Sequence, residues 1–351
     1  MDNRRKIGRR EFIKDVSLAG LGLAAGPALL NLAARESSAQ DGMSKVVIAT
    51  HPDSVNGTRV DAEIAQLMVD AGVMQYTGLP TAGEAWASVL PDFSEDDLVT
   101  IKVNCINSSL PTHPQVVDAI VVGLIAAGVK DNNIIIWDRT NNELTRCGYK
   151  RNTGNTGVRC FGTNEGGWGY STQVKISNRN SQLSKILTST DHLINVPVLK
   201  DHGTSGVTLS MKNHYGSVSN PGSLHGGSCD PYIGELNNLA EIKDKTRFIV
   251  LDANLGSYSG GPGAPPQFAY NSIVVAQDPV ALDYQGWKIL EAERKKHNRS
   301  LPQPKHIGTA ATLGVGTNDP DKILLEMIDL QEQAVVAAGK LSTTWGAMKK
   351  R

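Results

Sequence analysis

The sequence has no excess of basic residues, because 35 Lys and Arg balance 35 Asp and Glu among its 351 residues. Proteins that bind nucleic-acid phosphates need a basic surface, so this composition argues against nucleic-acid binding. Aromatic residues make up only 5%, while 35 residues are Gly, which favours an aliphatic core with many loops. With 40% hydrophobic and 20% charged residues, the composition excludes a mainly disordered chain and a coiled coil.

Several motifs of familiar sites are also missing. The four cysteines, Cys105, Cys147, Cys160 and Cys229, form no C-x-x-C or C-x-x-C-H pattern, so the chain has no iron–sulfur cluster motif and no haem attachment motif. No P-loop, no G-x-G-x-x-G after a strand and no G-x-S-x-G is present. The pairing of the cysteines stays open. Cys147 and Cys160 could form a disulfide, and Cys105 and Cys229 could form another, stay as thiols or bind a soft metal.

The first 39 residues have the three parts of an export signal: a basic stretch, an apolar stretch over 16–34 and small residues at 37–39. Within them, Arg9-Arg10-Glu11-Phe12-Ile13-Lys14 resembles the motif of the twin-arginine (Tat) pathway. We therefore expect residues 1–39 to be a signal peptide that engages the Tat translocase. The alternative is a retained membrane anchor, although Gly and Pro make this segment a marginal span.

Residues 40–351 then form the mature protein, which we expect in the periplasm or another extracytoplasmic space. No later stretch reaches the roughly 18 apolar residues of a transmembrane helix, so we expect no stable membrane span in the mature chain.

The mature chain predicts a single large α/β domain. Short β-branched runs predict strands, and amphipathic stretches with capping signals predict helices. The expected strands cover 45–50, 98–104, 133–138, 174–177, 192–199, 248–252 and 272–278; the expected helices cover 59–71, 113–127, 181–188, 233–242, 279–295 and 320–338. This alternation predicts a mostly parallel sheet with helices on both faces. The Gly-, Asn- and Thr-rich region 139–172 predicts a long irregular insertion.

Polar residues stand where the predicted strands end. In a mostly parallel sheet these ends meet at one edge, where ligands usually bind. The residues are Lys102, Asn104, His113, Asp138, Asp252, Asp278 and, inside the following helix, Asp283. Carboxylates and imidazoles suit a divalent metal, and lysines suit a phosphate or carboxylate. We do not count Asp278 as a ligand, because it precedes Pro279 and is more typical of a helix cap. We also do not count His306, which we expect on the surface.

The segment 200–229 combines the most polar groups with flexible glycines. It contains Lys200, Asp201, His202, Lys212, Asn213, His214 and His225. Few core packings need so many polar groups, so the segment predicts a functional site. The histidine spacing matches no standard zinc pattern, and a divalent metal and a small anionic ligand both remain open.

These patterns give three groups of candidate residues. If the protein is an enzyme, which the sequence does not decide, a His or Asp acts as general base while lysines hold an anionic substrate. The catalytic candidates are His202, His214, Asp201, Lys200 and Lys212; the cofactor-binding candidates are Lys102, Asn104, His113 and Asn213; the metal candidates are Asp138, Asp252, Asp283 and His225.

Four motifs together resemble the bacterial domain-of-unknown-function 362 family over about residues 95–290. They are Ile101-Lys102-Val103-Asn104 with Thr112-His113-Pro114, the stretch from Asn195 to His202, the stretch from Ser210 to Gly216, and Asp278-Pro279-Val280-Ala281-Leu282-Asp283. The family has no settled general activity. Some members carry an added iron–sulfur ferredoxin module, which implies a redox association, but this chain lacks the cysteine run of that module.

Two hypotheses follow. The first is an exported protein with a metal- or anion-binding site at the carboxyl ends of the strands, either a metal-dependent or a redox-associated enzyme. The second is a non-catalytic binding or accessory protein for exported oxidoreductases.

Overall fold

The computed structural model describes residues 42–300 and 302–331. The predicted signal peptide, residues 1–39, lies outside the described residues. From Met43 onward the described chain forms one compact unit. Among the helices of this part, none combines the length and the apolar character needed to cross a membrane.

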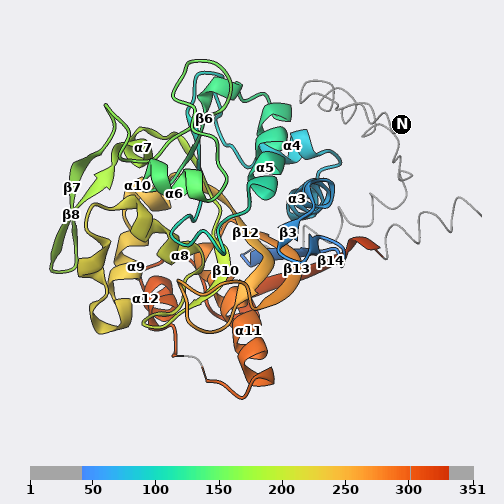
Figure 1. Ribbon diagram of the computed structural model, residues 1–351, viewed down its shortest axis with the longest axis vertical. Coiled ribbons are helices and arrows are strands. Elements are labelled where there is room, and N and C mark those ends of the chain that lie inside the picture. Colours follow the sequence, from blue (N-terminus) through green and yellow to red (C-terminus); the bar gives the residue numbers. More distant parts are fainter. Residues whose placement is uncertain (1–41, 301, 332–351) are drawn as a thin grey trace, which may run out of the picture. The chain divides into compact units, whose positions relative to one another are not determined.

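A mixed, mostly parallel sheet forms the centre of the molecule (Figure 1). Its path runs β14 (Ile323–Asp329), β1 (Ser44–Thr50), β13 (Phe268–Ala276), β12 (Thr246–Ser257), β9 (His192–Asn195), β4 (Val99–Lys102), β5 (Ile134–Trp137) and β6 (Arg159–Cys160). β10 (Val198–His202) pairs with the second half of β12 and with β11 (Gly206–Val207). Only β13 runs against its neighbours β1 and β12; the other pairs of the main path are parallel.

Helices cover both faces of this sheet, because successive strand residues point to opposite sides. Ile134 and Ile136 of β5 pack into one core, while Ile135 and Trp137 pack into the other. The first core lies under α3 (Ala62–Thr77), α4 (Ala82–Ser88) and α5 (Pro114–Ala126). The second lies under α7 (Lys185–Ser189), α8 (Leu209–Asn213), α9 (Tyr232–Asn237), α10 (Ala240–Lys243), α11 (Pro279–Lys296) and α12 (Lys305–Thr312). Figure 1 shows the two groups of helices on opposite sides of the sheet.

Two small hairpins lie outside the main sheet: β2 (Val55–Asn56) with β3 (Arg59–Val60), and β7 (Tyr170–Ile176) with β8 (Arg179–Ser184). Short 3₁₀ turns complete the chain: η2 (Asp131–Asn133), η3 (His214–Ser217), η4 (Pro221–Leu224), η5 (Gly226–Cys229) and η6 (Pro320–Lys322). The predicted fold class, a mostly parallel sheet with helices on both faces, is confirmed.

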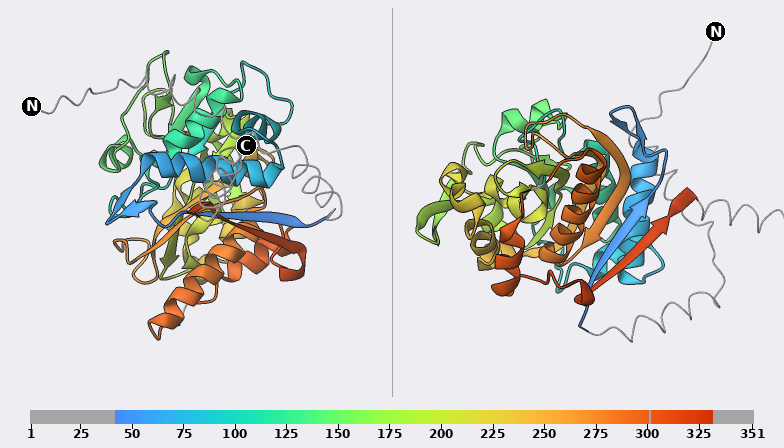
Figure 2. Two further views of the ribbon diagram at one scale, coloured as in Figure 1. Left: turned by 90° about the vertical axis from the view of Figure 1, so that its right-hand side faces the viewer. Right: turned by 90° about the horizontal axis from the view of Figure 1, so that it is seen from below.

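The helix predicted over 320–338 is wrong for its described part. After the turn η6, the chain forms β14, which pairs in parallel with β1. Figure 2 shows these two strands side by side, although they come from opposite ends of the described chain. The spacing of Ile323, Leu324, Met327 and Ile328 is typical of a helix, but this segment pairs with β1 instead and forms the edge strand of the sheet. Residues 332–338 lie outside the described chain.

Other element boundaries also differ. Residues 181–184 belong to β8, and the helix α7 covers only 185–189. The predicted strand 192–199 breaks at Val196-Pro197, because Pro has no N–H for a sheet ladder, and becomes β9 and β10. The predicted helix 233–242 divides into α9 and α10. The predicted irregular insertion contains helix α6 (Asn141–Arg146) and the edge strand β6.

The antiparallel direction of β13 separates Asp278 from the other strand-end residues and agrees with the prediction that Asp278 is a helix cap. Asp278 follows β13, so it lies at the edge opposite to the carboxyl ends of β4, β5 and β12. There it caps α11 by accepting hydrogen bonds from the N–H groups of Val280 and Ala281. Its role is therefore that of a helix cap.

Candidate functional site

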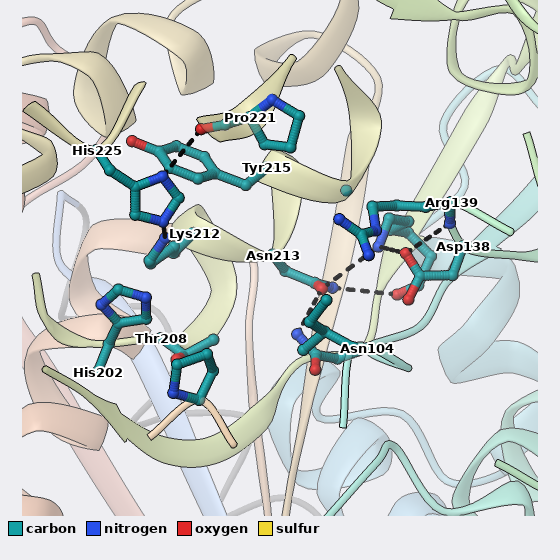
Figure 3. Close-up of a pocket in the computed structure, with 14 residues that line it drawn as sticks. Asn104, Asp138, Arg139, His202, Thr208, Lys212, Asn213, Tyr215, Pro221 and His225 are labelled. Carbon is teal, nitrogen blue, oxygen red and sulfur yellow. Dashed lines mark hydrogen bonds and ion pairs between the residues drawn. The ribbon is translucent and has the colours of Figure 1, made fainter. Parts of the chain in front are cut away.

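A cavity of about 220 Å³ opens at the carboxyl edge of β4, β5 and β10, under the segment that contains α8 and η3. Figure 3 shows its two walls, with Lys212, His202 and His225 on one side and Asp138, Arg139, Asn104 and Asn213 on the other. The residues that line it are Lys102, Asn104, Ile106, Asp138, Arg139, His202, Thr208, Lys212, Asn213, Tyr215, Gly216, Pro221, His225 and Pro262.

An ion pair between Lys102 and Asp138 forms one wall. Lys102 is the last residue of β4 and Asp138 follows β5, so parallel pairing of these strands brings the two together. The Lys102 Nζ lies 2.7 Å from Asp138 Oδ1, and both side chains are buried. The backbone N–H groups of Cys105 and Arg139 also donate to this carboxylate, at 2.6 and 2.9 Å. The Asp138 charge is therefore neutralised within the wall.

Three buried amides form a chain of hydrogen bonds that starts at Lys200 and meets this ion pair where Lys102 Nζ donates to Asn213 Oδ1 at 3.4 Å. Lys200 Nζ donates to Asn104 Oδ1 at 2.7 Å, and Asn104 Nδ2 donates to Asn213 Oδ1 at 3.0 Å. Asn213 Nδ2 donates to Asn195 Oδ1 at 2.7 Å, and Asn195 Nδ2 donates to the carbonyl of Ser210 at 3.0 Å. Every amide orientation follows from its neighbour, because the ammonium at the start can only donate. This network fixes α8 against the ends of β4, β9 and β10.

The opposite wall carries an ammonium without a carboxylate partner. Lys212 Nζ donates to His225 Nε2 at 3.3 Å and lies 3.8 Å from the centre of the Tyr215 ring. Among the described residues, no Asp or Glu lies within ion-pair distance of it. Burial lowers the pKa of Lys212 to about 8, so Lys212 is protonated in most molecules at pH 7. The His225 Nδ1 donates to the Pro221 carbonyl at 2.9 Å, which leaves Nε2 as the acceptor for Lys212.

His202 adds a neutral donor to the same wall. Burial, with Lys212 and His225 nearby, lowers the pKa of His202 to about 3, so the ring is uncharged. Its Nδ1 accepts from the backbone N–H groups of Thr204 and Ser205, at 3.2 Å each. A neutral ring whose Nδ1 accepts must carry its proton on Nε2. No described group accepts a hydrogen bond from that nitrogen.

Arg139 is a cavity residue that the sequence analysis missed. Its guanidinium forms an ion pair with Glu143 of α6, and this contact raises the pKa of Arg139. The signal was its position, since it directly follows Asp138 at the predicted strand end. Thr208, Ile106, Pro221, Tyr215 and Pro262 were not predicted either. They are small polar or apolar residues without a charge that would have distinguished them in the sequence.

The four predicted metal ligands do not come together. Only Asp138 and His225 line the cavity, on opposite walls. Asp252 lies inside β12, which continues to Ser257, and it binds the His113 ring at 2.6 Å. In the described part of the chain, no three His, Cys, Asp or Glu side chains are arranged to hold a metal ion.

The fourth predicted metal ligand, Asp283, holds the helix α8 in place. It accepts hydrogen bonds from the backbone N–H groups of Ser210 and Met211, at 2.7 and 3.1 Å. Burial raises the pKa of Asp283 to about 7. Its carboxyl group therefore positions the start of α8 and does not line the cavity.

The predicted catalytic residues also divide into two groups. Lys212 and His202 line the cavity, whereas Asp201, His214 and Lys200 lie behind its walls. Asp201 holds the loop at Gly261 through a hydrogen bond of 2.9 Å. His214 is fully enclosed beside Asn195, next to a smaller cavity of about 70 Å³.

Of the predicted cofactor-binding residues, Lys102, Asn104 and Asn213 line the cavity, while His113 does not. Contrary to the prediction of a surface position, His306 is fully buried on α12.

Comparison with known families agrees with the motifs. Residues 99–288 match the family described as domain of unknown function (DUF362). This match covers more than half of the chain and includes every residue that lines the cavity. No curated protein matches the sequence.

Proposed function

We propose that this chain, which belongs to the DUF362 family, binds a small organic anion in the cavity beside α8. The observation that carries the proposal is Lys212, a buried ammonium that lines the cavity and has no carboxylate partner among the described residues. A buried charge is costly unless it is paired. A bound carboxylate or phosphate oxygen would supply the missing partner.

Further donors support the same ligand class. The His202 Nε2–H, on the same wall as Lys212, has no described acceptor. Arg139 lies on the opposite wall, where a second anionic group of the ligand would meet a guanidinium. The cation Lys200, whose pKa burial lowers to about 8, adds positive potential from behind the wall.

The apolar part of the lining favours an organic ligand over a fully hydrated inorganic ion. Ile106, Pro221, Pro262 and the Tyr215 ring contribute to the cavity. A volume of about 220 Å³ is below the roughly 300–1,000 Å³ of typical sites for drug-sized ligands. The expected ligand is therefore a short organic acid or a small phosphate ester.

The test compares anion binding by the wild type and two lysine variants. Isothermal titration would use pyruvate, succinate and glycerol phosphate at constant ionic strength, with sodium chloride as the reference salt. A hydrogen bond to a charged group contributes about 1.5–3 kcal/mol, so Lys212→Met should weaken binding roughly 10- to 150-fold. Lys175→Met, an exposed residue of β7, is the matched control and should bind normally.

The pH dependence gives a second check on the same residue. Binding needs the ammonium form, so affinity should fall as pH rises through about 8 and beyond, where Lys212 loses its proton. Equal affinity of Lys212→Met and the wild type for every anion that binds would refute the proposal.

We also propose that the protein is exported through the Tat pathway, so that anion binding takes place outside the cytoplasm. Support comes from the Arg9-Arg10 pair and the basic, apolar and small-residue order of residues 1–39. Cell fractionation of the wild type and of an R9K/R10K variant tests this. Export that is unaffected by the double substitution would contradict it.

A further inference from the structure

Two cysteines from distant parts of the sequence meet behind the cavity. Cys105 follows β4, and Cys147 caps the end of α6. The Cys147 thiol lies 3.6 Å from the carbonyl oxygen of Cys105, and each thiol shifts the pKa of the other, because the two side chains lie close together. All four cysteines are free thiols and buried. The sequence left their pairing open, and this contact was not among the pairs it considered.

The other two cysteines lie in different surroundings. Cys160 belongs to the edge strand β6, where burial raises the pKa of its thiol to about 12. Cys229 is in side-chain contact with Tyr215 in the other core of the molecule. Among the described residues, the two thiols that shift each other's pKa are therefore Cys105 and Cys147.

The two thiols of this pair differ in acidity. The neighbouring Cys105 thiol lowers the pKa of Cys147, whereas burial raises the pKa of Cys105 well above its usual value. Burial and the Asp138 carboxylate oppose this lowering of the Cys147 pKa, while the Lys200 ammonium supports it. Cys147 is thus the thiol that loses its proton first, and it is the more accessible one, with 6% of its surface exposed against 1% for Cys105.

We propose that Cys105 and Cys147 are a redox-active dithiol, which a small peroxide oxidises to a disulfide beside the anion-binding cavity. The inference stands on the thiol contact and does not depend on which anion the cavity binds. It assigns a site of covalent modification to a part of the molecule that the proposed anion binding does not use.

The chemistry needs only hydrogen peroxide as oxidant. The Cys147 thiolate attacks one peroxide oxygen, the O–O bond breaks, and the departing hydroxide takes a proton to become water. Cys105 then attacks the sulfur of the resulting sulfenic acid, the S–O bond breaks, and a second water leaves with the proton of Cys105. In total two thiols lose two electrons, and one peroxide is reduced to two waters.

One hydrogen bond connects the two thiols to the cavity, so oxidation of the thiols would affect the cavity wall. The backbone N–H of Cys105 donates to Asp138 at 2.6 Å, and Asp138 pairs with Lys102 in the cavity wall. Closing the disulfide pulls on Cys105, whose neighbour Ile106 also lines the cavity. Oxidation and ligand binding should therefore influence each other.

The experiment treats the reduced full-length protein with equimolar hydrogen peroxide, denatures it and blocks free thiols with iodoacetamide. Mass spectrometry of unreduced peptides should show Cys105 linked to Cys147, a mass loss of about 2 Da, and alkylated Cys160 and Cys229. A C160S/C229S variant should give the same crosslink, whereas C105S and C147S should lose it.

Four fully alkylated cysteines, a crosslink through Cys160 or Cys229, or sulfinic acid on Cys147 without a crosslink would each overturn the proposal. The readout on the wild type needs no substitution, so it does not depend on whether a variant folds.

Discussion

The ion pair between Lys102 and Asp138 predicts a large and measurable loss of stability on substitution of one partner. In Lys102→Met, the apolar replacement keeps much of the side-chain volume but removes the ammonium 2.7 Å from the carboxylate. Asp138 is then a buried charge without a cation. Breaking a buried ion pair in this way typically costs about 3–5 kcal/mol.

The surroundings of Asp138 place the expected loss in the free energy of unfolding near the lower end of this range, at about 3 kcal/mol. The carboxylate keeps the N–H donors of Cys105 and Arg139, which offset part of the lost charge interaction. The substitution also removes the donor of the Val103 carbonyl, which accepts from Lys102 at 2.7 Å. A loss of this size is a large fraction of the total stability of a domain, about 5–15 kcal/mol.

Equilibrium urea unfolding, followed by far-ultraviolet circular dichroism, measures this loss. Tryptophan fluorescence is unsuitable because the Lys102 ammonium lies 5.5 Å from the Trp137 ring, so the substitution changes the probe itself. The matched control is Lys130→Met, which removes an exposed ammonium that pairs with Glu95 and Asp96 at 3.2 and 3.3 Å. We expect no measurable change from this exposed network.

A double-mutant cycle separates the pair from the individual side chains. K102M/D138N removes both charges, so its loss should be smaller than the sum of the single losses by more than about 1 kcal/mol. Strictly additive losses, or a Lys102→Met variant as stable as Lys130→Met, would refute the reasoning.

Two further predictions concern the residues around this pair. Burial by itself would lower the pKa of His113, but the neighbouring Asp252 carboxylate has the larger effect and raises this pKa above its usual value. For Asp252, burial by itself would raise the pKa, but the contact with His113 lowers it. The stabilisation by His113 is therefore full below about pH 6.5 and is lost as pH rises through the raised pKa of His113. The substitution His113→Asn should lower the free energy of unfolding more at pH 6 than at pH 9. An equal loss at both pH values would contradict this. A Cβ at Gly216 would lie 2.7 Å from Asp138 Oδ1 and 2.8 Å from Lys102 Nζ, so Gly216→Ala should lower the melting temperature and weaken anion binding. Gly222→Ala, where nothing lies within 4 Å of the added Cβ, is its control, and equal melting temperatures of the two variants would show that the ion pair yields without cost.

The sequence predicted where the cavity lies better than it predicted which residues line the cavity. Parallel strand ends meet at one edge, so Lys102 and Asp138 could be placed together before the structure was known. The direction of β13 could not be predicted, because the loop between β12 and β13 is long enough in the sequence for either direction. Both strands extend further into that loop than expected, which makes the connection a hairpin.

The role of each carboxylate was also beyond the sequence. Asp138, Asp252 and Asp283 all follow or precede apolar runs, and all are buried. Their partners come from segments far along the chain: Lys102, His113 and the start of α8. Residue type and spacing show that a carboxylate is present, but only the packing decides whether a cation, an imidazole or a backbone N–H satisfies it.

Because β13 runs in the opposite direction, a structural contact and the cavity lie at opposite edges of the sheet. At one edge Asp278 caps α11 and also accepts from Thr317 N–H at 2.9 Å, while the cavity lies at the other edge. None of the hydrogen-bond partners of Asp278 lines the cavity, so we expect substitutions at the two edges to have nearly additive effects on stability. Directed evolution of this protein could therefore diversify the cavity freely, provided that strengthened contacts around Asp278 first supply a reserve of stability.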